Sequence, residues 1–324
     1  MVAGQIAALA VMGLASGAAM AGTQDYPSKP VTLVVPFAPG GSLDMVGRML
    51  GEQLGTHFGK PFVIENRPGG GTNVATAGVA RAAPDGHTLL ITTSSLAINV
   101  SLYKKLGYDP LNDFAPVALA AHIPLVLVVN STLPAQSVAD LIALAKERPG
   151  ALSFASGGSG SAPHLSAELF KSMAGIEMTH VPYRGGSQAL SDVVAGHVQV
   201  IFADPGSVLP QIRGGKVRAL GVTSPRRMPA IPDIAPIAEV GVPGFDAVSW
   251  QLVAAPAKTP REIVYRLQSA IKGVMAQPDI ETRLADLGLI RVDSPSPEAL
   301  RRFLASEIER WGEVVHRAGL AGSE

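Results

Sequence analysis

The 324-residue sequence contains no cysteine. This absence excludes disulfides, thiolate metal sites, a cysteine nucleophile and a lipidated N-terminal cysteine. The sequence also lacks an excess of either charge, because 26 lysines and arginines balance 26 aspartates and glutamates. A nucleic-acid-binding protein normally carries a basic stripe, so we predict no nucleic-acid partner.

Motifs for cofactor and metal binding are missing as well. No G-x-G-x-x-G follows an expected strand, so a dinucleotide site is unsupported. Residues 55–61 contain glycine and lysine but have neither the spacing nor the Ser/Thr of a P-loop. The histidines do not show metal-ligand spacing. We therefore predict no cofactor, no metal ion and no catalytic residue.

The first 21 residues are nearly all small or apolar and end in Ala19-Met20-Ala21. This pattern predicts a secretory signal peptide over residues 1–21, cleaved near Ala21 or Gly22, and hence a periplasmic mature protein. One feature departs from the usual signal, since no lysine or arginine precedes the apolar run. A retained membrane anchor is the alternative, although the run is barely long enough to span a membrane.

A strand, a glycine turn and a helix start are expected to meet at residues 31–44. The run Val31–Val35 predicts a buried strand, and apolar residues at helical spacing follow from Val46. Between them, Gly40 and Gly41 leave the backbone bare for a close approach. The free amides of the helix start at Ser42 favour an anion. An ordinary strand-to-helix turn with Ser42 as N-cap is the alternative.

Strand and helix patterns alternate along most of the chain, which predicts an α/β protein with parallel sheets. Ligands collect at the carboxyl ends of such strands. Two unusually long apolar segments, residues 117–129 and 247–255, are expected to be strands that cross between two domains. The first is interrupted by His122 and Pro124, so it is expected to bend at the proline. We therefore predict a discontinuous domain I over residues 26–124 and 247–324, and a domain II over residues 125–246.

A second glycine-serine loop, residues 156–164, repeats the first in the predicted second domain. Two helix ends that face each other could hold a small anion. Each helix dipole contributes about 0.3–1 kcal/mol to binding, and each hydrogen bond from a backbone N–H to the charged ligand contributes about 1.5–3 kcal/mol. This arithmetic favours a binding protein. A serine hydrolase is the alternative, since Ser159 approaches a G-x-S-x-G elbow with His164, His180 and His197 downstream.

The chain resembles the periplasmic substrate-binding proteins of tripartite tricarboxylate transporters, the Bug or TctC-like receptors. The resemblance runs over essentially the whole mature chain and rests on many ordered motifs. They include Tyr26-Pro27-Ser28-Lys29-Pro30, Gly40-Gly41-Ser42-Leu43-Asp44, Glu65-Asn66-Arg67-Pro68-Gly69, Pro84-Asp85-Gly86-His87, Tyr183-Arg184-Gly185-Gly186 and Ala255-Pro256-Ala257-Lys258-Thr259-Pro260.

The resemblance implies a two-lobed periplasmic-binding-protein (Venus-flytrap) fold, type II-like, with two interdomain crossings. It implies a carboxylate ligand held between the two glycine-serine loops. The residues carried over by position, with cleft-lining candidates, are Gly40, Gly41, Ser42, Thr93, Ser94, Ser159, Gly160, Ser161, Tyr183 and Asp204. Relatives often carry aspartate one place before Asp204, where this chain has Ala203, which weakens an amino-acid assignment. For Asp44 we favour stabilisation of the helix dipole over ligand contact.

These observations predict an extracytoplasmic solute receptor. It would bind a small organic carboxylate between two lobes, as a monomer, and deliver it to the permease subunits of a tripartite tricarboxylate transporter. A periplasmic sensing subunit for a two-component signalling system needs the same cleft and is the alternative from another class. The identity of the carboxylate does not follow from the sequence.

Overall fold

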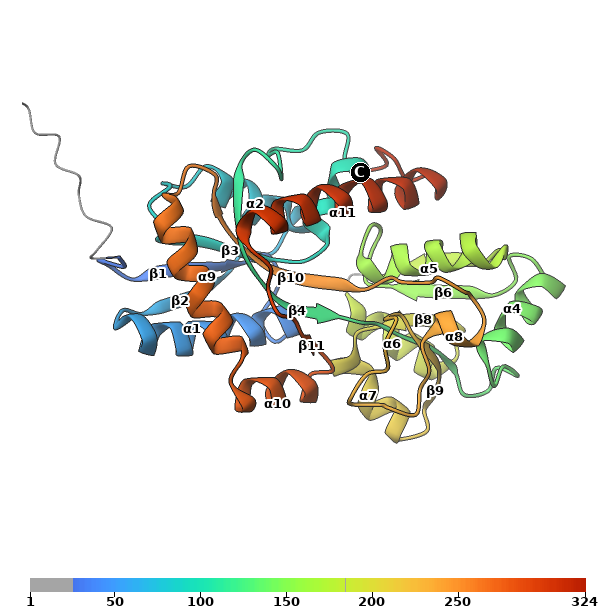
Figure 1. The fold of residues 1–324 in the computed structure, drawn as a ribbon. Helices are drawn as coiled ribbons and strands as arrows, with labels where there is room; N and C mark the ends of the chain where they lie inside the picture. The colour runs from blue at the N-terminus through green and yellow to red at the C-terminus, as the bar shows by residue number, and fades with distance from the viewer. Residues whose placement is uncertain (1–25, 184) are drawn as a thin grey trace, which may run out of the picture.

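The computed structural model describes residues 26–183 and 185–324. The predicted signal peptide and the alternative anchor, residues 1–21, lie outside the described residues. Two sheets with their helices form two lobes side by side (Figure 1). We call the lobe with the six-stranded sheet the first lobe and the lobe with the five-stranded sheet the second lobe.

The first lobe contains the sheet β11-β4-β10-β3-β1-β2. Its strands are β1 (Val31–Val35), β2 (Phe62–Asn66), β3 (Thr88–Thr92), β4 (Phe114–Ile123), β10 (Ser249–Pro256) and β11 (Ile290–Arg291). Its helices are α1 (Ser42–Phe58), the short 3-10 helix η2 (Gly70–Thr72), α2 (Asn73–Ala80), α3 (Ser95–Leu102), α9 (Arg261–Met275), α10 (Pro278–Asp286) and α11 (Pro297–Arg317). Strands β1, β2 and β3 are parallel, as predicted, but β10 runs antiparallel to β3 and β4.

The second lobe contains the sheet β7-β6-β8-β5-β9. Its strands are β5 (Val126–Asn130), β6 (Ser153–Ser156), β7 (Thr179–Pro182), β8 (Val200–Ala203) and β9 (Val217–Val222). Its helices are α4 (Val138–Glu147), α5 (Ala162–Ala174), α6 (Gly186–Ala195), α7 (Pro205–Arg213) and α8 (Ile237–Val240). Strands β6, β7 and β8 are parallel, whereas β5 is antiparallel to β8 and β9. Both sheets are therefore mixed, because β5 and β10, the strands that follow the two crossings, run opposite to the parallel strands of their sheets.

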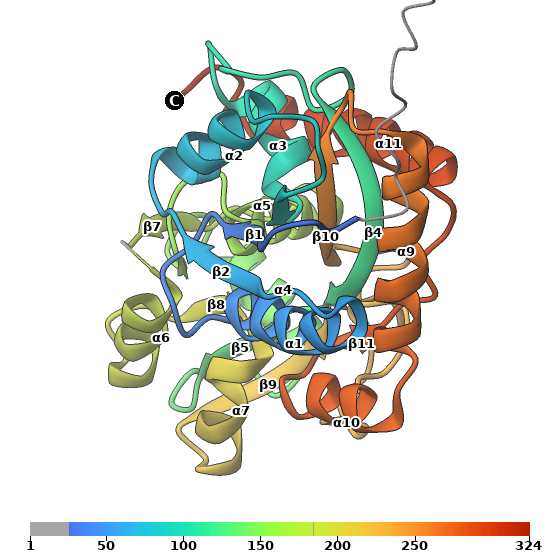
Figure 2. The ribbon, with the colours of Figure 1, turned by 90° about the vertical axis from the view of Figure 1, so that its left-hand side faces the viewer.

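Helices cover both faces of the first sheet. Figure 2 shows α2 and α3 on one side of it and α1 on the other. The side chains of β10 alternate between the two apolar clusters: Trp250 and Leu252 pack on one face, and Val253 and Ala255 on the other. This alternation is the normal period of a strand. It makes β10 a buried strand covered on both sides.

The predicted crossing strand at residues 117–129 is divided at its proline into two strands. Strand β4 ends at Ile123 and β5 begins at Val126, because Pro124 has no backbone N–H for the ladder. At this break, buried Thr223 forms hydrogen bonds with the backbone of Leu125, between the two strands. Its N–H donates to Leu125 O (2.9 Å), and its Oγ1 accepts from the Leu125 N–H (2.8 Å). Its carbonyl accepts from Ala247 N at 3.1 Å, which ties the second crossing to the first.

Candidate functional site

The carboxyl ends of the parallel strands in both lobes point toward the crossing. In the second lobe, Ala203 at the end of β8 pairs with Val126, the first residue after the crossing. In the first lobe, Thr92 at the end of β3 pairs with Leu252, near the start of β10. Loops at the carboxyl ends of parallel strands are where α/β proteins bind ligands. The loops that follow β1, β3, β6 and β8 therefore lie at the interface between the lobes.

The loop after β1 leads into the N-terminus of α1. Gly40 has a φ of +93°, a left-handed conformation that favours glycine. The N-cap is Gly41, with a φ of −80°, and not Ser42, which is already helical. The first intrahelical bond runs from Met45 N to Gly41 O, so the preceding amides of the helix have no intrahelical partner. A Cβ atom at either Gly40 or Gly41 would meet nothing within 4 Å, so the loop faces open space.

The side chain of Asp44 stabilises this loop through hydrogen bonds. Its buried carboxylate accepts from Gly40 N (2.9 Å), from Arg48 Nε and Nη2 (3.0 Å each) and from Asn66 Nδ2 (3.0 Å). Burial alone would raise the pKa of Asp44, but the hydrogen bonds from Arg48, Gly40 and Asn66 outweigh burial and lower the pKa. The carboxylate is thus fully engaged within the first lobe.

The second glycine-serine loop is held by its own hydrogen bonds. Ser161 Oγ donates to Gly158 O at 2.7 Å, and Gly160 N donates to His164 Nδ1 at 3.0 Å. Gly160 has a φ of +71°, and a Cβ there would lie 1.9 Å from Leu102 Cδ2 of the first lobe. The hydroxyl of Ser161 and the amide of Gly160 are therefore turned inward. Ser159 is exposed.

Two stacked histidines support this loop. The rings of His164 and His180 are parallel within 9° with centroids 3.8 Å apart, and Phe154 stacks on His180. His180 Nε2 lies 2.7 Å from Ser156 Oγ. Burial, with the nearby charges of His180 and Lys171, lowers the pKa of His164 to about 3. Burial and Lys171 lower the pKa of His180 to about 4. Both rings are therefore neutral at neutral pH.

These low pKa values make the stability of the protein depend on pH. A histidine of the unfolded chain titrates near 6.5, so below that pH the unfolded state binds more protons than the folded state. The stabilisation is fully present above pH 6.5 and is lost as the pH falls toward 4 and 3. Each histidine adds a slope of at most about 1.4 kcal/mol per pH unit. We expect His164→Gln and His180→Gln each to flatten the slope between pH 6.5 and 5 in urea denaturation; a wild-type slope in both variants would contradict this account.

The three histidines considered for a hydrolase all have other neighbours than Ser159. His164 accepts from Gly160, and His180 lies against Ser156. His197 Nδ1 lies 3.7 Å from Asp192 Oδ1. Within residues 26–183 and 185–324, the structure places no group of three or more histidines and carboxylates that could hold a metal ion.

Three further predicted residues direct their hydroxyls to neighbours. Thr93 Oγ1 lies 3.1 Å from Ser95 Oγ, and the buried Ser94 Oγ lies 2.8 Å from Ser249 Oγ on β10. Tyr183 donates to Asp192 Oδ2 at 2.7 Å. Desolvation and the Asp192 carboxylate raise the pKa of Tyr183 to about 12, so its phenol remains a donor.

The structure brings the first loop into contact with Asp204 across the lobe interface. Ser42 Oγ donates to Asp204 Oδ2 at 3.4 Å, and Asp204 Oδ1 caps α7 by accepting from Gly206 N at 3.0 Å. Desolvation raises the pKa of Asp204, although these two hydrogen bonds lower it. Among the residues described, no hydrogen bond joins residues 40–42 to residues 159–161.

Sequence reasoning missed the polar residues beside β2 and β3. Asn66 at the end of β2 donates to both Phe37 O and Asp44 Oδ1 (3.0 Å each). Thr72 has a φ of +82° and donates to Ser95 Oγ at 3.3 Å, extending the hydroxyl pair of Thr93 and Ser95. Asn66 stands in a motif already quoted for its loop, and that position was the available signal. The left-handed backbone conformation of Thr72 could not be predicted, because threonine rarely adopts it.

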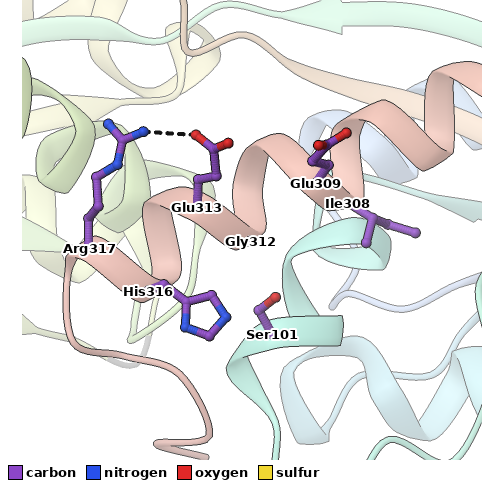
Figure 3. Close-up of a pocket in the computed structure, with 7 residues that line it drawn as sticks. All are labelled: Ser101, Ile308, Glu309, Gly312, Glu313, His316 and Arg317. Atoms are coloured by element: carbon purple, nitrogen blue, oxygen red, sulfur yellow. Dashed lines mark hydrogen bonds and ion pairs between the residues drawn. The ribbon is translucent and has the colours of Figure 1, made fainter.

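A surface hollow of about 530 Å³ lies elsewhere, between α3 and α11 (Figure 3). Its lining includes Ser101, Gly312 and His316, and two of its charged residues, Glu313 and Arg317, pair with each other at 2.8 Å. None of the predicted site residues lines it.

In residues 26–183 and 185–324 there is no helix with the length and apolar character needed to cross a membrane.

Comparisons with known proteins place the chain among solute receptors. A family model described as "Tripartite tricarboxylate transporter family receptor" matches residues 46–320. Protein BugT of Bordetella pertussis is 37% identical over 317 residues, which cover 96% of this chain and 97% of BugT.

Two solved structures are similar in both sequence and fold. Rpa4515 of R. palustris, solved with adipate, is 39% identical with a TM-score of 0.84, over 92% of this chain and 99% of that one. MatC of Rhodopseudomonas palustris, solved with bound malate, is 35% identical with a TM-score of 0.78, over 90% of this chain and 100% of that one.

Proposed function

Because the chain belongs to the tripartite tricarboxylate transporter receptor family, whose members are periplasmic binding proteins and not enzymes, we propose that it captures a small organic carboxylate and delivers it to the membrane permease of such a transporter. We propose that the ligand lies between a domain I of residues 26–124 and 247–324 and a domain II of residues 125–246. The protein acts as a monomer, and residues 1–21 are its signal peptide.

The observation that carries this proposal is the N-terminus of α1. The Gly40-Gly41 turn faces open space, and the amides that follow it have no intrahelical partner. A hydrogen bond from a backbone N–H to a carboxylate contributes about 1.5–3 kcal/mol to binding, and the helix dipole contributes about 0.3–1 kcal/mol. A few such bonds reach the roughly 8 kcal/mol of micromolar affinity once ordering costs are met. Ser42 lies opposite Asp204, so both lobes contribute to the site.

The ligand class follows from the relatives. Malate and adipate were found in two similar receptors, so we propose that a small dicarboxylate or hydroxycarboxylate is the ligand here. A thermal-shift screen of organic acids tests this proposal, with malate and adipate as the first probes. A rise in Tm that saturates with ligand concentration supports it. A screen in which no organic acid raises Tm contradicts it.

The first loop is tested by Gly41→Val. Position 41 has a φ that any residue adopts, and a Cβ there meets nothing within 4 Å, so we expect the variant to fold. The branched side chain would occupy the approach to the free amides, so the ligand-induced rise in Tm should disappear. Gly273→Val, at an exposed position of α9 where a Cβ also meets nothing within 4 Å, is the matched control and should keep the rise. A full rise in Gly41→Val would remove the loop from the site.

A further inference from the structure

Gln251 on β10 carries a buried side-chain amide without a partner. Its exposed fraction is 0%, and neither Oε1 nor Nε2 has a hydrogen bond to any described residue. A buried amide without a partner destabilises a fold, whereas an apolar side chain of the same size would not. Gln268 on α9 shows the usual arrangement, because its Nε2 donates to Pro295 O at 2.6 Å. The unpartnered amide of Gln251 therefore destabilises the fold, and packing in the core does not explain why a glutamine stands at this position.

The position of Gln251 along β10 places it at the lobe interface. In the antiparallel β10–β3 pair, Leu252 lies opposite Thr92, so the next pair toward the crossing sets Gln251 beside Thr93. Two residues earlier, Ser249 Oγ lies 2.8 Å from Ser94 Oγ. Gln251 is thus adjacent to the loop after β3, which the sequence predicts to line the ligand site.

The face of Gln251 is the one that α1 covers. Trp250 and Leu252 pack in the cluster on the other face, so the residue between them points to the face that α1 shares with α9. On the α1 face, a Cβ at Gly47 would lie 3.8 Å from Ile91 of β3, and one at Gly51 would lie 2.9 Å from Phe62 O at the start of β2. The helix therefore runs back along the sheet.

The level of Gln251 on that face follows from this direction. One helical turn before Gly47 lies Leu43, and the next residue after Ile91 on the same face of β3 is Thr93. Gln251 stands beside Thr93 and hence level with the first turn of α1. This is the turn whose backbone amides have no intrahelical partner.

We propose that the carboxamide of Gln251 is part of the ligand site. Its Nε2 donates to the carboxylate held at the N-terminus of α1, and its Oε1 accepts from a hydroxyl where the ligand has one. The lobes touch in this structure through Ser42 and Asp204 and through Leu102 and Gly160, so a group at the base of their interface is shut off from solvent. Its burial therefore does not make Gln251 a core residue. This inference rests on the proposed function.

Gln251→Met tests the inference, because methionine keeps the length and approximate volume of the side chain and removes both polar atoms. We expect the ligand-free variant to have a Tm equal to or above that of the wild type, since an unpartnered amide is lost. We expect its affinities for malate and adipate, measured by titration calorimetry, to fall at least tenfold. Gln268→Met is the matched control: it loses a made hydrogen bond, so its Tm should fall while its affinities stay at the wild-type values.

The outcomes separate the inference from the function on which it rests. If the wild type binds either acid and Gln251→Met binds it equally well, the inference is overturned and the proposed function stands. A lower Tm of ligand-free Gln251→Met also overturns it, because the amide would then be satisfied within the fold. If no organic acid binds the wild type, the proposed function fails and the inference fails with it.

Discussion

Replacing Glu307 with leucine is expected to lower the free energy of unfolding by about 3–5 kcal/mol. The carboxylate is 5% exposed, and its Oε2 accepts from both Trp250 Nε1 (2.7 Å) and Trp311 Nε1 (3.0 Å). Its Oε1 accepts from Arg310 Nη1 at 2.9 Å. Leucine would leave two buried indole N–H groups and a partly buried guanidinium without this acceptor, and each unsatisfied donor costs about 1–3 kcal/mol.

Two variants control for the substitution itself. Glu307→Gln keeps an oxygen that can accept from an indole and should lose less stability than Glu307→Leu. Glu309→Gln changes an exposed carboxylate two residues along the same helix and should stay within about 0.5 kcal/mol of the wild type. Urea denaturation followed by circular dichroism measures all three. A loss below about 1 kcal/mol in Glu307→Leu would show that the three donors find other partners.

Gly160→Ala is expected to weaken carboxylate binding at least tenfold. Position 160 has a φ of +71°, and a Cβ there would lie 1.9 Å from Leu102 Cδ2 and 3.2 Å from its Cγ. Gly160 belongs to the second lobe and Leu102 to the first, so the added methyl group would push the lobes apart where they meet. Titration with malate and adipate measures the effect.

Two further variants separate the contact from backbone strain. Gly215 has a φ of +65° with nothing within 4 Å of its Cβ position, so Gly215→Ala carries the strain without the contact and should bind like the wild type. Adding Leu102→Ala to Gly160→Ala removes the contact and should restore most of the lost affinity. A double variant that binds no better than Gly160→Ala would assign the loss to the loop backbone alone.

The local elements of the fold could be predicted from sequence because their signals are local. The strand, glycine turn and helix at residues 31–58 follow from apolar periodicity and two glycines. The start of α11 is equally local, since Ser296 Oγ accepts from Ala299 N and Pro297 occupies the first helical position. The break at Pro124 is likewise marked by its residue type. The antiparallel entry of β10 depends on pairing between distant segments, and no local pattern encodes such pairing.

In the candidate site, too, the features encoded by local sequence could be predicted and those set by distant contacts could not. The first loop was predicted from its glycines, and its bare, outward-facing turn is a property of those residues. The orientation of the hydroxyls could not be found, because their partners lie far away in sequence. Ser94 meets Ser249 at a separation of 155 residues, and Ser42 meets Asp204 at a separation of 162. Residue type alone therefore marked these positions as polar without saying which atoms stay available to a ligand.

The shared carboxylate of Glu307 has a consequence for observing the protein at work. The chain contains two tryptophans, and both donate to this one side chain, with Trp250 on the strand that enters the first lobe from the crossing. All indole emission of the native molecule thus originates beside that crossing strand. Intrinsic fluorescence gives an optical readout of any movement there, with no dye attached.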